Sequence, residues 1–123
     1  MEFENDFVDE KPVAFEIDGR KFKLKPVTAG DENDWSNEYI SLDEKGNKVT
    51  NIDKINECKM RNLVEVPYGK ERINNQIGVD KEWKDLSQSE QWSFLRGLNR
   101  KLFNKIVLKI EEIDNPSTKE KKN

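Results

Sequence analysis

Histidine is missing from all 123 residues of the sequence. Its imidazole is the usual general base near neutral pH and a common ligand of transition metals, so its absence removes the Ser-His and Cys-His nucleophile systems and most transition-metal sites. Catalysis would depend on carboxylates, lysines and tyrosines. Adjacent acids such as Asp31 and Glu32 point in different directions on a helix or a strand and make no acid/base pair. We expect no enzyme activity, no metal ion and no cofactor.

Cysteine is almost missing too, since Cys58 is the single thiol of the sequence. One cysteine forms neither an internal disulfide nor a thiol-rich zinc site, and such sparing use is typical of the reducing cytoplasm. One flanking lysine is weak support for a reactive thiolate, so we expect an inert, partly buried thiol. No apolar run approaches the roughly 20 residues that span a bilayer, and the acidic N-terminus is unlike a signal peptide. The sequence predicts a cytoplasmic protein that does not enter a membrane.

Nucleotide-binding and calcium-binding motifs are lacking as well. There is neither a Gly-x-Gly-x-x-Gly fingerprint nor a phosphate-binding Gly-Lys-Ser/Thr pattern, and residues 31–34 and 43–47 lack the ligand spacing of a calcium loop. Acids outnumber bases by 25 to 22, and this net charge of −3 opposes general attraction to nucleic acid. The basic strip over residues 20–25 either meets phosphates or covers the outer face of a hairpin, and the net charge favours the second. We expect protein partners and no nucleic acid.

What the sequence does contain is a clear hairpin signal. Two alternating five-residue segments flank Asp18-Gly19, which suits a type I′ turn because both central residues of that turn need positive φ. A two-residue loop determines the register, so Phe15 lies opposite Phe22. The predicted hairpin therefore has one apolar face, which a core would cover, and one charged face.

Apolar spacing and capping residues predict the helices. Thr28 resembles an N-cap with a carboxylate, Asp31, at the third helical position; Ser87 and Glu90 have the form of a capping box; and Asn99 is a natural cap for the last helix. The predicted helices cover about 29–38, 51–64, a short stretch that ends at Gly78, a stretch that follows Ser87, and 100–113. Residues 40–50 form either a second small hairpin or only a loop.

Together these signals predict an α+β fold in which an N-terminal β-hairpin packs on a small bundle of three to five helices. Residues 12–113 form a single globular domain between a flexible N-terminal arm, 1–11, and a disordered polar tail, 114–123. Charged residues make up 38% of the chain and apolar ones 33%. The core is therefore thin, and a partner protein or a homo-oligomer would complete it.

Five residues are candidates for contact with a partner protein. Trp83 lies in a connector and either fills the core, which the usual burial of tryptophan favours, or anchors a partner. The last helix has an arc of apolar side chains formed by Leu102, Phe103, Ile106, Val107, Ile110 and Ile113. Leu108 falls outside this apolar arc and would contact a partner together with the uncovered parts of Phe103, Val107 and Ile110. The alternative, which periodicity favours, is that this arc packs inside the domain.

Several short motifs resemble those of one family. They are the hairpin from Phe15 to Pro26, a helix containing Trp35, the segment Glu82-Trp83-Lys84-x-Leu86 and a closing pair of helices. Over residues 13–113 the pattern resembles the small tail assembly chaperones of long-tailed phages and prophages.

This resemblance implies a small, largely helical module, often with an N-terminal hairpin, that binds the tape-measure protein or tail-tube subunits during virion assembly. Members of the family have no catalytic residues, and their place of action is the cytoplasm of the host cell. Two other classes remain open. One is a structural connector or tail-completion protein of a phage, and the other is a cytosolic adaptor for protein–protein interaction.

Overall fold

The structure is a computed structural model that describes residues 11–114. The predicted N-terminal arm and polar tail lie outside these residues, apart from Lys11 and Asp114. Asp114, predicted to begin the tail, is the last residue of a helix. A small antiparallel sheet followed by five α-helices confirms the α+β fold class within the described part of the chain.

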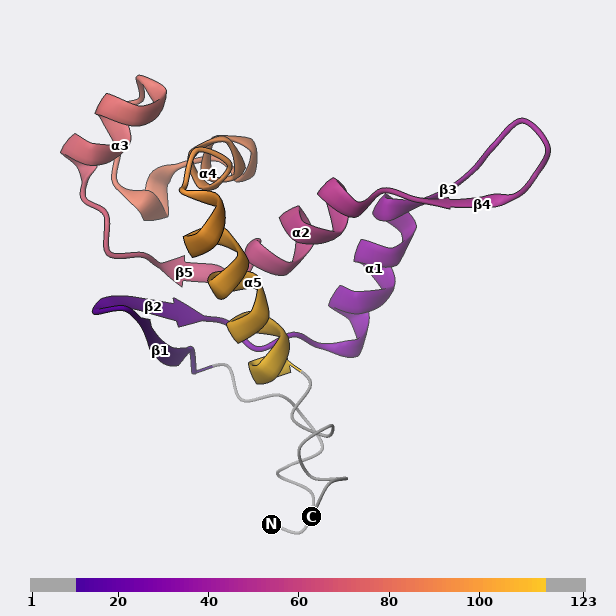
Figure 1. Ribbon diagram of the computed structural model, residues 1–123, viewed down its shortest axis with the longest axis horizontal. Coiled ribbons are helices and arrows are strands. Elements are labelled where there is room, and N and C mark those ends of the chain that lie inside the picture. The colour runs from indigo at the N-terminus through magenta and orange to yellow at the C-terminus, as the bar shows by residue number, and fades with distance from the viewer. Residues whose placement is uncertain (1–10, 115–123) are drawn as a thin grey trace, which may run out of the picture.

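The first two strands, β1 (Val13–Ile17) and β2 (Arg20–Leu24), form the predicted hairpin in the predicted register. Asp18 and Gly19 both have positive φ, 49° and 84°, as the type I′ turn requires. Phe15 and Phe22 stack across the strands with their ring centroids 5.2 Å apart. The charged face stays open to solvent, and the apolar face is covered by the helices (Figure 1).

The helix predicted over 51–64 is wrong at its C-terminal end, from residue 61 onward. Helix α2 (Ile52–Met60) ends at Met60, and Leu63–Glu65 forms strand β5, which pairs antiparallel with β2. Leu63 faces Leu24 in this pairing and is almost fully buried. Strand β5 forms hydrogen bonds to the free edge of β2 and buries Leu63, and these gains outweigh the helical preference of the segment. The helical spacing of residues 61–64 carries no information about β2, which lies about 40 residues earlier in the sequence.

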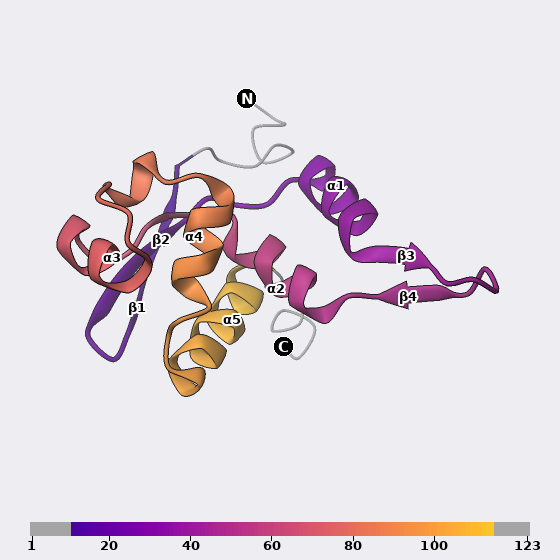
Figure 2. The ribbon, with the colours of Figure 1, turned by 90° about the horizontal axis from the view of Figure 1, so that it is seen from above.

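Residues 40–50 form a second hairpin, which is one of the two structures predicted for this segment. Strand β3 (Ile40–Leu42) directly follows helix α1 (Ala29–Tyr39), and β4 (Lys48–Thr50) leads into α2. A capping box between Thr28 and Asp31 begins α1 as predicted. This second hairpin extends away from all other described elements (Figure 1, Figure 2).

The remaining elements lie after β5 and form the other end of the molecule. They are α3 (Lys70–Ile77), a 3₁₀ turn (Trp83–Asp85), α4 (Gln88–Leu95) and α5 (Arg100–Asp114). Gly78 ends α3 in the left-handed conformation, and the predicted capping box of Ser87 and Glu90 begins α4. Asn99 accepts a hydrogen bond from the Lys101 amide at the start of α5, which confirms its predicted capping role.

The core lies between the three-stranded sheet and helices α2 to α5. Trp83 is buried there, and its indole Nε1 donates a 3.1 Å hydrogen bond to the carbonyl oxygen of Leu63. Of the two places predicted for Trp83, the core and a partner-binding surface, the structure shows the core. The side chains that are most completely buried are those of Phe22, Leu24, Cys58, Met60, Leu63, Ile73, Leu95, Ile106 and Ile110.

Candidate protein-binding surface

The β3–β4 hairpin and the first residue of α2 form a projection, residues 40–52, that carries exposed apolar side chains. Leu42 is 67% exposed, Ile52 is 71% exposed, and Val49 and Ile40 are also open to solvent. The register places Ile40 and Leu42 on one face of the hairpin and Val49 on the other. Both faces of the projection are therefore available for apolar contact.

The edges of the projection are free as well. Among residues 11–114 neither β3 nor β4 has a second neighbouring strand. The pairs Tyr39–Asn51 and Asp43–Asn47 are joined by hydrogen bonds, so in the alternating antiparallel pattern the backbone groups of Ile40 and Leu42 point outward. Edge groups of this kind accept a strand from another chain.

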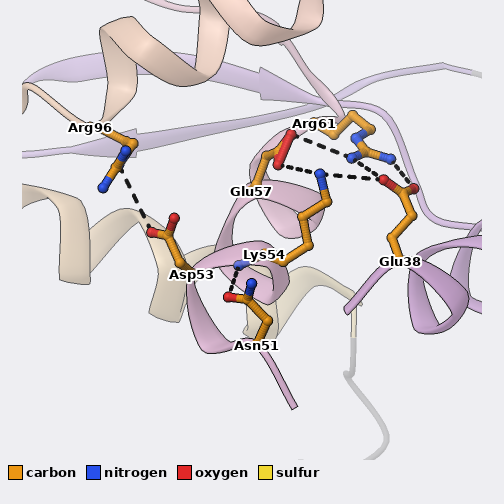
Figure 3. A network of polar contacts seen from close by, with 7 residues as sticks. All are labelled: Glu38, Asn51, Asp53, Lys54, Glu57, Arg61 and Arg96. Carbon is orange, nitrogen blue, oxygen red and sulfur yellow. Dashed lines mark hydrogen bonds and ion pairs between the residues drawn. The ribbon is translucent and has the colours of Figure 1, made fainter. Parts of the chain in front are cut away.

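A network of ion pairs at the base of the projection holds its two flanking helices together. Arg61 at the end of α2 donates to both carboxylate oxygens of Glu38 on α1, at 2.6 and 3.0 Å. Lys54 lies 2.9 Å from Glu57 and 3.6 Å from Glu38, and all four side chains converge (Figure 3). Hydrogen bonds from Arg61 lower the pKa of Glu38, and Glu57 raises the pKa of Lys54. These ion pairs join α1 to α2, and so they brace the two helices between which the projection extends.

Helix α1 covers a cavity of about 280 Å³ that lies between α1, α2 and α5. Every residue of α1 keeps part of its surface open, and Trp35 and Tyr39 are the aromatic side chains that line the cavity. Cys58 on α2 forms part of the wall and is buried, and burial raises the pKa of its thiol. A thiol held protonated in this way is a poor nucleophile, as its predicted inertness requires.

Asp114 at the rim of this cavity has its pKa raised from 3.8 to about 6, first by burial and then by repulsion from Glu32, against attraction from Lys59. The folded state thus holds this proton to higher pH than the unfolded state does. The free energy of unfolding should therefore fall as the pH rises from 3.8 to about 6.

Asp114→Asn removes the carboxyl group and with it this loss of folding free energy at higher pH. After discounting for the solvent exposure of the carboxylate, we expect the variant to be more stable than the natural chain at pH 7 by about 1 kcal/mol. Urea unfolding from pH 4 to 7 measures the difference, with Glu112→Gln on the exposed face of α5 as the control. If the free energies of unfolding of the variant and the natural chain differed by the same amount at every pH in this range, the prediction would be contradicted.

The five residues predicted to contact a partner do not form one surface. Trp83 and Ile110 are in the core, and Phe103 and Val107 pack against it with part of their surface open. Leu108 is 62% exposed, as its position outside the apolar arc predicts. The arc therefore packs against the core, and Leu108 lies outside it as an exposed side chain. Isolated exposed leucines are common on protein surfaces.

Sequence reasoning missed the projection as a candidate surface. The signal in the sequence was four apolar residues, Ile40, Leu42, Val49 and Ile52. They lie on either side of a turn-forming segment and do not follow helical spacing. Nothing in that pattern shows whether the hairpin folds back on the core or extends into solvent, because only long-range packing decides it.

Residues 11–114 offer no cluster for metal binding and no helix for crossing a membrane. Within this range no group of three or more cysteine and carboxylate side chains is placed to hold a metal ion. None of the described helices is long and apolar enough to cross a membrane.

Comparison with known proteins yields no match of the chain to a protein-family model, to a curated protein or to a solved structure.

Proposed function

We propose that this chain is a non-catalytic assembly protein that binds another protein through the projection. The observation that carries the proposal is the group of apolar side chains on a hairpin that extends into solvent, with Leu42 and Ile52 about two-thirds or more exposed. Apolar side chains gathered on an exposed element mark sites of protein interaction. The braced base keeps this element in place before a partner arrives, which lowers the entropic cost of binding.

Within this class, the best-supported function is that of a tail assembly chaperone of a phage or prophage. A chaperone must cover apolar surface of an aggregation-prone partner while its own charged periphery maintains solubility. The sequence places charge beside the projection, at Glu38 near the end of α1 and at Asp43 and Glu44 in the turn of the hairpin. The motif resemblance at residues 15–26 and 82–86 supports the same function. The partner would be the tape-measure protein or the tail-tube protein, in the cytoplasm of the host cell.

Separate co-expression of this chain with the tape-measure protein, the tail-tube protein and the portal protein encoded beside it tests the proposal. We expect the soluble fraction of the tape-measure or tail-tube protein to increase and a complex to co-purify. The finished particle should lack this chain. Co-purification with the portal alone, or no complex with any of the three, would contradict the chaperone function.

The free edges of β3 and β4 favour a second candidate, a structural connector or tail-completion protein. A connector joins copies of one chain into a lasting ring, and free strand edges are one means of joining copies. This candidate predicts that the chain remains in the purified particle and is a homo-oligomer by light scattering. The two candidates therefore differ in a single measurement on the finished particle.

A further inference from the structure

A second site lies at the opposite end of the molecule from the projection. The tip of the β1–β2 hairpin, α3 and the loop from α4 to α5 surround a crevice of about 200 Å³. Arg20 comes from the hairpin tip, Arg72 and Gln76 from α3, and Asn99 from the start of α5. Since Arg72 and Gln76 are four residues apart, they share one face of α3. The two arginines are more than 50 positions apart in sequence, and the fold brings both to one crevice.

Neither of the two arginines that line this crevice forms an ion pair within the described residues, although Arg20 attracts the nearby Asp18 carboxylate and helps to lower its pKa. Arg72 takes part in no ion pair there, and Arg20 makes one long hydrogen bond, 3.4 Å, to the carbonyl oxygen of Asp18. The carboxylate of Asp18, the nearest acid along the chain, is already bound to Lys105 at 2.7 Å. Two like charges at one crevice repel each other, and an anion between them would remove this repulsion.

The start of α5 also suits an anion at the crevice. Asn99 and the amides that follow it begin α5, a helix of 15 residues, and the N-terminus of a helix attracts negative charge. The wall includes Tyr68, whose hydroxyl oxygen is enclosed and has no hydrogen-bond partner among the described residues. An enclosed hydroxyl without a partner is costly, but it has no surface open to solvent and is therefore out of reach of a ligand in the crevice.

The apolar part of the lining narrows the class of ligand. The ring of Tyr68 lies against that of Phe94, with the centroids 5.3 Å apart, and Leu98 and Leu102 add aliphatic surface. A free inorganic anion gains nothing from such surface, whereas a peptide side chain next to a carboxylate does.

We propose that the crevice between Arg20 and Arg72 binds a carboxylate of an acidic, partly apolar segment in a partner protein. Arginine suits this task because its planar guanidinium donates two parallel hydrogen bonds to one carboxylate. The site is remote from the projection and does not depend on it. A partner that contacted both would be held at two ends of the molecule.

Calorimetric titration at low salt tests the proposal with the full chain. The probe is the blocked peptide acetyl-Glu-Leu-Glu-Leu-Glu-amide, and its counterpart with glutamine in place of each glutamate is the neutral control. We expect the acidic peptide to bind and the neutral one not to bind. Arg72→Gln should weaken binding by about tenfold or more, because it removes the charge and the paired donors. Lys48→Gln, the same change of charge on the projection, should leave binding unchanged.

Three results would overturn the proposal. The first is equal binding of the acidic peptide by the natural chain and Arg72→Gln, with both shown to be folded by their circular dichroism. The second is equal weakening by Lys48→Gln, which would indicate general charge attraction. The third is competition by inorganic phosphate at the peptide's own concentration, which would indicate a site for a free anion. None of these results bears on capture of a tail protein by the projection.

Discussion

Replacing Trp83 with alanine is expected to lower the free energy of unfolding by about 3–5 kcal/mol, the range for removal of a large buried aromatic side chain. Trp83 is 6% exposed and lies edge-on against Phe94, with the ring centroids 6.0 Å apart. The substitution leaves a cavity between β5 and α4, and the carbonyl of Leu63 loses its hydrogen bond from the indole. A domain of this size is stable by about 5–15 kcal/mol, so a large part of its stability depends on this residue.

Urea unfolding followed by circular dichroism measures the effect, because loss of one tryptophan does not alter the peptide signal used. Trp83→Phe is the matched control, since it keeps an aromatic ring and loses the indole N–H. Its cost should be smaller, about 1–3 kcal/mol for the unsatisfied carbonyl and the lost volume. If Trp83→Ala left stability unchanged and instead abolished binding of a partner, Trp83 would be a partner anchor and its placement in the core would be wrong.

Leu42→Asp is expected to weaken binding of the proposed partner strongly while the domain stays as stable as before. Leu42 is 67% exposed, and substitutions at such positions usually change the free energy of unfolding by less than about 0.5 kcal/mol. Burying the new carboxylate against an apolar partner would be costly, so we expect affinity to fall about tenfold or more. Co-purification with the tape-measure or tail-tube protein, followed by titration of the purified pair, measures this loss.

Two further variants show whether the loss of binding is specific to the projection. Val49→Asp tests the other face of the hairpin, because Val49 and Leu42 point to opposite sides. Leu108→Asp is the matched control, since Leu108 is exposed to almost the same degree but lies on α5. If Leu108→Asp abolished capture and the projection variants did not, the binding surface would be on α5 and the proposed role of the projection would be wrong.

Local features of the fold were predictable because their causes are local. The positive φ angles of Asp18 and Gly19 follow from a two-residue loop, and the loop determines the register of β1 and β2. The box at Ser87 and Glu90 begins α4 because it satisfies amide groups within three residues of each other. Such interactions are complete within a few residues, so no distant part of the chain changes them.

The error at β5 shows where local reasoning ends. Apolar residues continue at helical spacing through Val64, yet α2 ends at Met60. Strand β5 exists because β2 presents an edge that must be paired and a side chain, Leu24, against which Leu63 can be buried. Pairing between strands so far apart in sequence has no signal in either segment alone.

By itself the sequence determined the fold class, the first hairpin and its register, the helix caps and the exposure of Leu108, because hydrogen bonds and periodicity within a few residues specify them. Tertiary structure alone decided that Trp83 and Ile110 lie in the core and that the hairpin at 40–50 extends into solvent. It also decided that Arg20 and Arg72 share a crevice. These outcomes depend on which faces of distant elements meet, and that follows from the packing of the whole core and not from any one segment.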